Sequence, residues 1–316
     1  MPLAAAIASG LVAALLYLSV LTGSLGALIL VYLVQLPLFA AGLSLGAKAV
    51  LIAGGTATLV TAAVGGVLSG VLFFLAEALP PMLLVYQALR SRTDGTGAVA
   101  WYPSGRLVLW LCGIGAAILL GAALFLTGTA DGFRGTVHGF LAGQLDALLG
   151  TARTATAAGQ KSQAEAMAEA LTAFFPAMAV GSWLIMTTVN GILAQGALAR
   201  FGLNRRPAPD MAALTLPRWT AGVLAASLLI ALVASGDTGY LGANLAPVLA
   251  LAYVFAGLAV MHAVLRRQAG RILILVPAYL ALLLGWPVLL VAACGMIDQW
   301  FGLRQRFAAS LPRQGE

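Results

Sequence analysis

Glu77 is the single carboxylate in an otherwise apolar run over residues 71–89. A carboxylate inside a membrane span costs on the order of a few kcal/mol unless it is protonated, paired or turned toward water. Pro80 and Pro81 follow closely. Because proline has no N–H, the pair is expected to free the carbonyls of Ala76 and Glu77 and to kink the helix. A carboxyl group beside unpaired carbonyls is suited to binding a proton, a cation or an ammonium group.

Three further polar side chains occur in other apolar runs, one at a similar depth to Glu77 and two in the predicted cytoplasmic half of a span. Gln35 lies in the second run, and Thr187 and Asn190 lie in the sixth. Together with Glu77 they are expected to line a polar pocket that binds a small-molecule ligand. The alternative is a structural role, in which Glu77 is a protonated, hydrogen-bonded group and the amides are ordinary interhelical contacts.

The composition indicates what kind of elements must position these residues. Hydrophobic residues make up 61% of the 316 and charged residues only 9%, about a third of the share usual in soluble domains. A soluble enzyme, a disordered chain and a nucleic-acid-binding domain are excluded, because none of them carries so much apolar surface. The net charge of +7 forms no basic and aromatic stripe, so no nucleic-acid partner is expected. The sequence predicts an all-α, polytopic transmembrane helix bundle whose partner is the lipid bilayer.

Apolar runs of about 20 residues are long enough to cross a bilayer as helices. The sequence predicts about nine such spans, between eight and ten, within a single integral membrane domain over 1–316. The stretch 48–89 is long enough for two of them, joined at Gly65-Gly66. The remaining runs are 3–21, 26–45, 107–128, 171–196, 219–235, 244–264 and 272–301.

Basic residues orient the predicted spans, because cytoplasmic loops carry an excess of Lys and Arg. With the N-terminus in the cytoplasm, eleven basic residues fall on the cytoplasmic side and three on the outer side. The eleven are Lys48, Arg90, Arg92, Arg106, Arg200, Arg205, Arg206, Arg218, Arg266, Arg267 and Arg271, and the three are Arg134, Arg153 and Lys161. Since the Arg- and Ala-rich composition is typical of bacteria with GC-rich genomes, we predict a protein of the bacterial cytoplasmic membrane with its N-terminus inside.

The last apolar run, 272–301, fits two arrangements, because it is long for one helix and short for two. In the first it is a hairpin broken near Gly285-Trp286-Pro287, with both ends in the cytoplasm. In the second it is one long tilted helix, which places the C-terminus outside. A basic tail over 302–316 follows in either case.

The segment 129–170 is predicted to lie outside the membrane on the outer side. Apolar residues from Phe133 to Leu148 recur there at helical spacing. They predict an amphipathic helix, a small-residue linker over 151–159 and a second helix over 163–171 that continues into the sixth span. This insert either lies on the membrane surface or over the bundle, or it closes an outward-facing cavity as a lid.

The loop 197–218 is rich in Arg and Pro and is predicted to be cytoplasmic. Its charges either mark only the cytoplasmic side or form a docking surface for a membrane or cytoplasmic protein partner. In the second interpretation Arg205 and Arg206 face the partner, together with Asp298 and Arg304 near the C-terminus. No salt bridge is predicted between Asp298 and Arg304.

The sequence offers little for catalysis or metal binding. It has no His-Glu-x-x-His motif and no Walker motif, so an ATP-driven step would need a partner protein. Its two histidines, His138 and His262, and its two cysteines, Cys112 and Cys294, are too widely separated for a recognisable zinc site. We therefore expect no catalytic residue, no metal, no cofactor and no enzyme activity.

Two stretches of the sequence carry a family resemblance. The first contains Pro176, Asn190, Arg200, Pro207-x-Pro209 and Leu216-Pro217-Arg218-Trp219. The second is the ending Gly295-x-x-Asp298-x-Trp300-Phe301-x-x-Arg304-x-Arg306. Through these motifs the chain resembles the YybS-like family of bacterial predicted membrane proteins of unknown function over most of its length. That family is similar in its membrane core to the substrate-binding components of energy-coupling-factor transporters, which have fewer helices than this chain.

The resemblance implies a multi-helix bundle with a small-molecule pocket that opens outward, and it brings no catalytic residue. Two functions stay open at this point. The first is a membrane-embedded solute-binding or transport component whose pocket is lined by Glu77, Gln35 and Asn190. The second is a non-catalytic scaffold of the cell envelope or division machinery, which works through the loop 197–218 and the segment 298–306.

Overall fold

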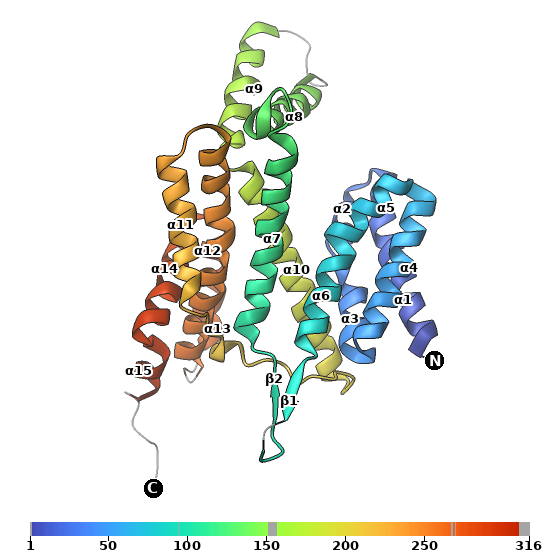
Figure 1. Ribbon diagram of the computed structural model, residues 1–316, viewed down its shortest axis with the longest axis vertical. Coiled ribbons are helices and arrows are strands. Elements are labelled where there is room, and N and C mark those ends of the chain that lie inside the picture. The colour runs from blue at the N-terminus through green and yellow to red at the C-terminus, as the bar shows by residue number, and fades with distance from the viewer. Residues whose placement is uncertain (1, 94, 151–156, 267, 269, 310–316) are drawn as a thin grey trace. The chain divides into compact units, whose positions relative to one another are not determined.

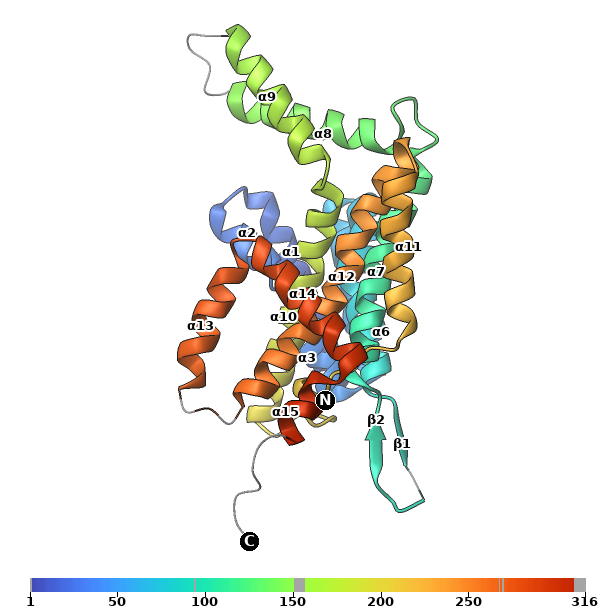
Figure 2. The same cartoon turned by 90° about the vertical axis from the view of Figure 1, so that its left-hand side faces the viewer.

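The computed structural model describes residues 2–93, 95–150, 157–266, 268 and 270–309. This part of the chain is almost entirely helical (Figures 1 and 2), which confirms the all-α class. A short antiparallel hairpin, β1 (Ser91–Thr93) and β2 (Val99–Trp101), pairs Ser91 with Trp101. The helices are α1 (Pro2–Leu18), α2 (Leu25–Val31), α3 (Gln35–Leu45), α4 (Ala47–Gly65), α5 (Val67–Phe73), α6 (Leu79–Ala88), α7 (Ser104–Leu126), α8 (Gly132–Gly150), α9 (Ala157–Thr172), α10 (Phe175–Arg200), α11 (Trp219–Val233), α12 (Gly236–Leu265), α13 (Arg271–Leu282), α14 (Trp286–Phe301) and α15 (Leu303–Ala309).

Single-turn elements extend or join several of these helices. A 3-10 turn, η1 (Ser19–Thr22), follows α1, and a π-helical turn, η2 (Phe74–Ala78), joins α5 to α6. A second 3-10 turn, η3 (Met211–Ala213), lies between α10 and α11.

Within the described residues, seven helical segments are long and apolar enough to cross a membrane. They are Pro2–Thr22, Leu25–Leu45, α4, Val67–Ala88, α7, α10 and α12. The bent pair α13–α14 makes an eighth candidate, and α11 is a shorter apolar helix. Every apolar run of the sequence is therefore helical, and the expected number of about nine spans is close to the seven or eight that length and composition support.

The contacts divide the chain into two compact units. The first consists of Met1–Leu111 and Trp183–Leu214, and the second of Cys112–Ser182 and Thr215–Glu316. Helices α7 and α10 each contribute one part to each unit. The predicted single membrane domain thus contains two separately packed groups of helices.

In the first unit, α4 packs against α1, α3, α5 and α6. The buried core contains large apolar side chains such as Leu38, Phe73 and Val85. Gly10 lets α1 approach α4 closely, because a Cβ at position 10 would overlap the carbonyl oxygen of Ala53. Small residues at such crossings are typical of helix packing in membranes.

In the second unit, α12 packs against both α11 and α14. The last apolar run breaks at Gly285, whose φ is +83°, and the two helices on either side are bent by 116°. Pro287 follows at the start of α14 and lacks an N–H for a continuing helix. One straight tilted helix is therefore wrong for 272–301, and the break near Gly285-Trp286-Pro287 is confirmed.

The predicted insert over 129–170 is a pair of helices, α8 and α9, which pack against each other. Phe133 and Leu141 are buried, in agreement with an amphipathic helix. Helix α9 begins at Ala157 rather than 163, and it ends at Thr172, two residues before α10. Residues 151–156 of the predicted linker, which include Arg153, lie outside the described residues. The same holds for Arg267, for residues 310–316 of the basic tail and for the side chain of Lys161.

Candidate functional site

Gln35 and Glu77 meet inside the first unit. Gln35 Nε2 donates to Glu77 Oε2 at 3.0 Å and to the carbonyl oxygen of Ala76 at 3.3 Å. Both side chains are buried, with Glu77 only 6% exposed. The expected proximity of these two residues, 42 positions apart, is therefore present in the fold.

The carbonyl of Ala76 is free because residue 80 is proline. An ordinary helix would bond this carbonyl to the N–H four residues later, which Pro80 does not have. The side chains of Gln35 and Trp183 supply the missing donors, and Trp183 Nε1 lies 3.0 Å from the oxygen. The freed carbonyl of Ala76 is thus confirmed. The disturbance caused by Pro80 and Pro81 takes the form of the π-helical turn η2 within a segment that still qualifies as one span.

Asn190 meets a second irregular span. The segment Leu25–Leu45 is interrupted by turns between α2 and α3. Asn190 Nδ2 donates to the carbonyl oxygen of Tyr32 in this break at 2.7 Å and to that of Met186 at 2.9 Å. Since Gln35 begins α3, Asn190 and Gln35 hold the two sides of the same interruption.

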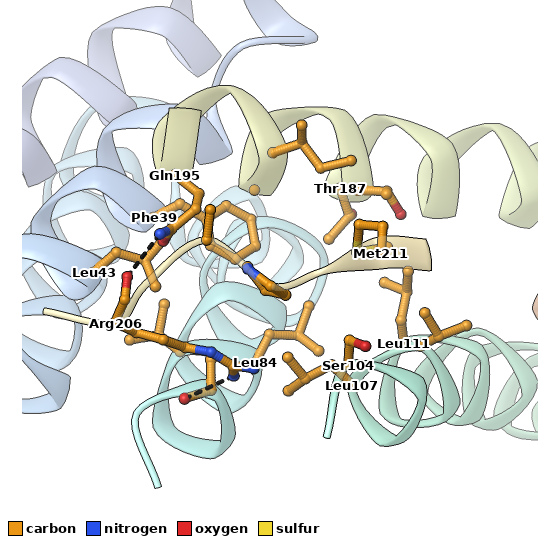
Figure 3. A pocket seen from close by; sticks show the side chains of 18 of the residues that line it. Phe39, Leu43, Leu84, Ser104, Leu107, Leu111, Thr187, Gln195, Arg206 and Met211 are labelled. Atoms are coloured by element: carbon orange, nitrogen blue, oxygen red, sulfur yellow. Dashed lines mark hydrogen bonds between the residues drawn. The ribbon is translucent and has the colours of Figure 1, made fainter. Parts of the chain in front are cut away.

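A cavity of about 300 Å³ lies in the first unit, between α3, α6, α7, α10 and the segment that follows α10 (Figure 3). Its wall is mostly apolar and includes Phe39, Leu84 and Leu107. Of the four residues predicted to bind a ligand, only Thr187 lines it. Glu77, Gln35 and Asn190 do not line this cavity, and their side chains form hydrogen bonds between helices instead.

The polar cluster (Gln35, Glu77, Ala76 and Trp183) and the cavity are nevertheless built on the same helices. Phe39 and Thr187 each lie four residues after a cluster residue, Gln35 and Trp183 respectively, which is about 6 Å of helix rise. On the third helix, Leu84 follows Glu77 by seven residues. A displacement of any of these helices would change the cluster and the cavity together.

Three of the four predicted residues keep a buried polar atom without a hydrogen-bond partner in the described part of the chain. These atoms are Gln35 Oε1, Thr187 Oγ1 and Asn190 Oδ1. An unsatisfied buried polar atom costs about 1–3 kcal/mol. Such atoms are typical of sites that complete their hydrogen bonds with a ligand or water.

Arg206 is a buried residue of the cavity wall. It is 5% exposed, and its Nη1 and Nη2 donate to the carbonyl oxygens of Ala88 at 2.9 Å and Tyr102 at 2.8 Å. Its own carbonyl accepts from Gln195 Nε2 at 2.8 Å. Burial lowers the pKa of the guanidinium, although an arginine stays charged at any physiological pH. The expected role of Arg206 at a partner-facing surface is wrong, because the loop folds this side chain inward.

The family model described as "Predicted membrane protein (DUF2232)" matches residues 7–299 of the chain. The chain belongs to the DUF2232 family. No curated protein and no solved structure matches it. The part of this DUF2232 protein that matches contains the whole polar cluster and every residue that lines the cavity.

The other residues expected to face a partner also make contacts within the DUF2232 chain. Arg205 is exposed, but its Nε donates to the carbonyl of Ser44 at 3.0 Å and its backbone N–H donates to that of Leu43. Arg205 therefore caps the C-terminal end of α3, where a positive charge is favourable.

Asp298 and Arg304 form an ion pair that the sequence did not predict. Arg304 Nε and Nη2 lie 2.9 and 2.6 Å from Asp298 Oδ2, and the backbone N–H of Arg304 donates to Oδ1 at 3.0 Å. Asp298 is only 6% exposed. The pair joins α14 to α15, so a partner-facing role for Asp298 is wrong.

One motif in the DUF2232 chain has the spacing of a catalytic serine motif but lies in different surroundings. Residues 42–46 read Gly-Leu-Ser-Leu-Gly, the spacing of a nucleophile elbow, which requires a strand-to-helix turn. Here they are the end of a helix, and Ser44 Oγ donates to the carbonyl of Ala40 at 2.6 Å. Among the described residues, no group of three or more His, Cys, Asp or Glu residues is placed to hold a metal ion.

Proposed function

We propose that this membrane protein is a solute-binding or transport component that takes a small, mainly apolar molecule into the cavity of its first unit. The observation that carries the proposal is the cavity itself. It has about 300 Å³ and a mostly apolar wall that includes Thr187 and Arg206, and small-molecule sites are likewise mainly apolar with few polar groups. Binding, and not catalysis, is the activity that these groups support.

The irregular spans next to the cavity support this function. Interrupted helices with backbone carbonyls outside the regular bonding pattern are frequent at the substrate and ion sites of transporters. Two spans of the first unit are irregular, one at Tyr32 and the other at η2. Glu77 at the second interruption is a group of the kind that proton- or cation-coupled transport uses.

The direction of three helices, together with the positions of the basic residues, supports a cytoplasmic location for the N-terminus. Each of α3, α6 and α10 has the same sequence of contacts from its N-terminal to its C-terminal part. The polar cluster comes first, the cavity wall second, and a contact with Arg205 or Arg206 last. These three helices therefore end on a common side, as the second, fourth and sixth spans of a multi-pass protein do, and the basic residues decide which side it is. The same side carries most of the basic loop residues, so we propose the bacterial cytoplasmic membrane with the cavity near the cytoplasmic ends.

The proposed position of the cavity differs from the outward-opening pocket that the YybS-like resemblance and its likeness to energy-coupling-factor components imply. The difference leaves a binding function in place but reverses the side from which solute reaches the cavity. A protein partner that supplies energy at the cytoplasmic face is compatible with this arrangement.

The scaffold alternative has less support from the contacts. It relied on charged residues that face a partner. Arg206 and Asp298 are buried, and Arg205 and Arg304 bind groups of the same chain. A scaffold function would have to use other surfaces.

The proposal can be tested by filling the cavity. Gly191 lines it, and a Cβ at this position would make ordinary contacts with the ring of Phe39. Gly191→Leu should leave the fold intact and remove co-purifying small molecules detected by mass spectrometry of gently extracted protein. Gly222→Leu, at an exposed position of α11, is the matched control. An identical small-molecule content in both variants and the wild type would refute a cavity-bound solute.

A further inference from the structure

Arg206 is a buried cation whose contacts with the protein are all neutral. A guanidinium has five N–H donors, and two of them bond the carbonyls of Ala88 and Tyr102. In the described part of the chain no carboxylate pairs with Arg206, and its three other N–H donors have no acceptor. Buried charges are usually paired, since an uncompensated one is costly. This site therefore has an excess positive charge and unused donors.

The same residue forms part of the cavity wall. Figure 3 shows the Arg206 side chain extending along the side of the cavity formed by α6, near Leu84. Leu107 and Leu111 of α7 contribute apolar wall, and Thr187 also lines the cavity, with a buried hydroxyl that finds no hydrogen-bond partner among the described residues. One pocket thus combines a cation with a large hydrocarbon surface.

We propose that the ligand of this cavity is an amphiphilic acid, whose carboxylate or phosphate group binds Arg206 and whose apolar body contacts the leucine side chains of α6 and α7. This inference rests on the proposed binding function and specifies its ligand class. A guanidinium presents parallel N–H groups that match the two oxygens of a carboxylate or phosphate. An alcohol would leave the charge unpaired, and an amine would add a second positive charge.

Charge selectivity is the first measurement, and it requires no mutation. Full-length protein in dodecyl maltoside is dialysed to equilibrium against radiolabelled octanoate, with protein-free micelles as the blank. We expect saturable binding at one site. Octyl phosphate should displace the label, whereas 1-octanol and octylamine should compete at least about tenfold more weakly, as expected for the loss of a charge-assisted bond.

Variants then locate the acid group. Arg206→Gln should weaken octanoate binding by about 10- to 100-fold, the effect of one or more charge-assisted hydrogen bonds. Arg206→Lys keeps the charge but loses the parallel donors, so we expect an intermediate loss. Gly191→Leu should abolish binding while Arg206 is retained, and Gly222→Leu should bind as the wild type does. If Arg206→Gln does not fold, the comparison of the four probes on wild-type protein still decides whether the site prefers an acid.

The outcomes separate this inference from the proposed function. Equal binding of octanol, octylamine and octanoate, all lost in Gly191→Leu, would overturn the acid and keep the cavity as a binding site. Octanoate binding that is unchanged in a folded Arg206→Gln variant would also overturn it. Failure of every probe to bind saturably would overturn both proposals.

A membrane lipid and a soluble acid could each supply the anionic group, and a further arm distinguishes them. Octanoate binding is compared in nanodiscs of phosphatidylcholine and in nanodiscs in which half of the lipid is phosphatidylglycerol. Competition by phosphatidylglycerol would assign the acid to the membrane, and equal binding would assign it to the aqueous phase. Either result agrees with an amphiphilic acid at Arg206.

Discussion

Trp183 and Gln35 donate hydrogen bonds to the same acceptor, the carbonyl oxygen of Ala76, at distances of 3.0 and 3.3 Å. The acceptor lies in the π-helical turn before α6, and the donors belong to α10 and α3. One backbone oxygen thus joins three helices of the first unit. This oxygen is available because Pro80 has no N–H to bond it. One proline in one span therefore provides a contact point for two other helices.

Removal of one of the two donors should weaken this junction. We expect Trp183→Phe to destabilise the protein by about 0.5–1.5 kcal/mol for the lost Nε1 hydrogen bond, with a further loss because the smaller phenyl ring packs less well at this half-buried position. Unfolding in mixed micelles of dodecyl maltoside and sodium dodecyl sulfate measures the change. Trp219→Phe, at an exposed position, is the control. Equal stability of the two variants would contradict a structural role for the Trp183 bond.

Variants of Glu77 should separate structure from function. Glu77→Gln keeps an acceptor for Gln35 Nε2, so we expect nearly unchanged stability and normal insertion. Glu77→Leu removes the acceptor and should cost about 1–3 kcal/mol, measured by the same unfolding assay. If Glu77 serves only packing, a reconstituted Glu77→Gln variant should keep full solute uptake, whereas a role in proton or cation coupling predicts its loss.

Two neighbouring arginines should respond differently to the same substitution. Arg206→Gln leaves the carbonyls of Ala88 and Tyr102 without their donors and should expose the segment 201–214 to limited proteolysis. Arg205→Gln removes only a helix-capping interaction at the exposed end of α3, for which we expect about 0.3–1 kcal/mol. Protease sensitivity that rises equally in both variants would contradict the buried position of Arg206.

The ion pair of Asp298 should control the order of α15. We expect Asp298→Asn to weaken the bonds to Arg304 and to speed hydrogen exchange of the amides over 303–307. The effect should be local, because α15 contacts only α12 and α14 extensively in the described structure. Glu165→Gln, on an exposed part of α9, is a charge-matched control that should leave these amides unchanged.

The bend at Gly285 predicts the location of the C-terminus. Helices α13 and α14 have 12 and 16 residues, or about 18 and 24 Å of rise, and each is shorter than the roughly 30 Å hydrocarbon core. We therefore expect both ends of the pair on the same side of the membrane. Reporter fusions after Gln268 and after Glu316 should give the same topology signal, and opposite signals would show that the pair crosses.

Much of the fold follows from the sequence, because apolar length alone determines where spans occur. The break at Gly285-Trp286-Pro287 was predictable from residues that interrupt helices. The contact between Gln35 and Glu77 was also predictable, since polar groups at similar depth in a bilayer have few other partners. The spacing of residues along one helix does not, however, specify which neighbouring helix each side chain faces.

The loops were harder to predict for a different reason. Lys and Arg in loops indicate the side of the membrane and say little about individual contacts, so charge alone predicts exposed positions for Arg206 and Asp298, although both are buried. The hairpin β1–β2 was not expected either. The sequence signal was weak, because the Asp-Gly pattern of Asp94-Gly95 predicts a two-residue turn, whereas the pairing of Thr93 with Val99 requires a longer connection.

The π-helical turn η2 determines which face of α6 points toward the cavity. A π turn accommodates one residue more than an α turn, and one residue corresponds to about 100° of rotation about a helix axis. If η2 rewound as an ordinary α turn, α6 would rotate by about that angle relative to α5. Leu84 and Ala88 would then leave the wall of the cavity, and the acceptor for Arg206 would turn away with them. Whether η2 is a π turn or an α turn therefore decides whether α6 contributes its wall residues to the cavity.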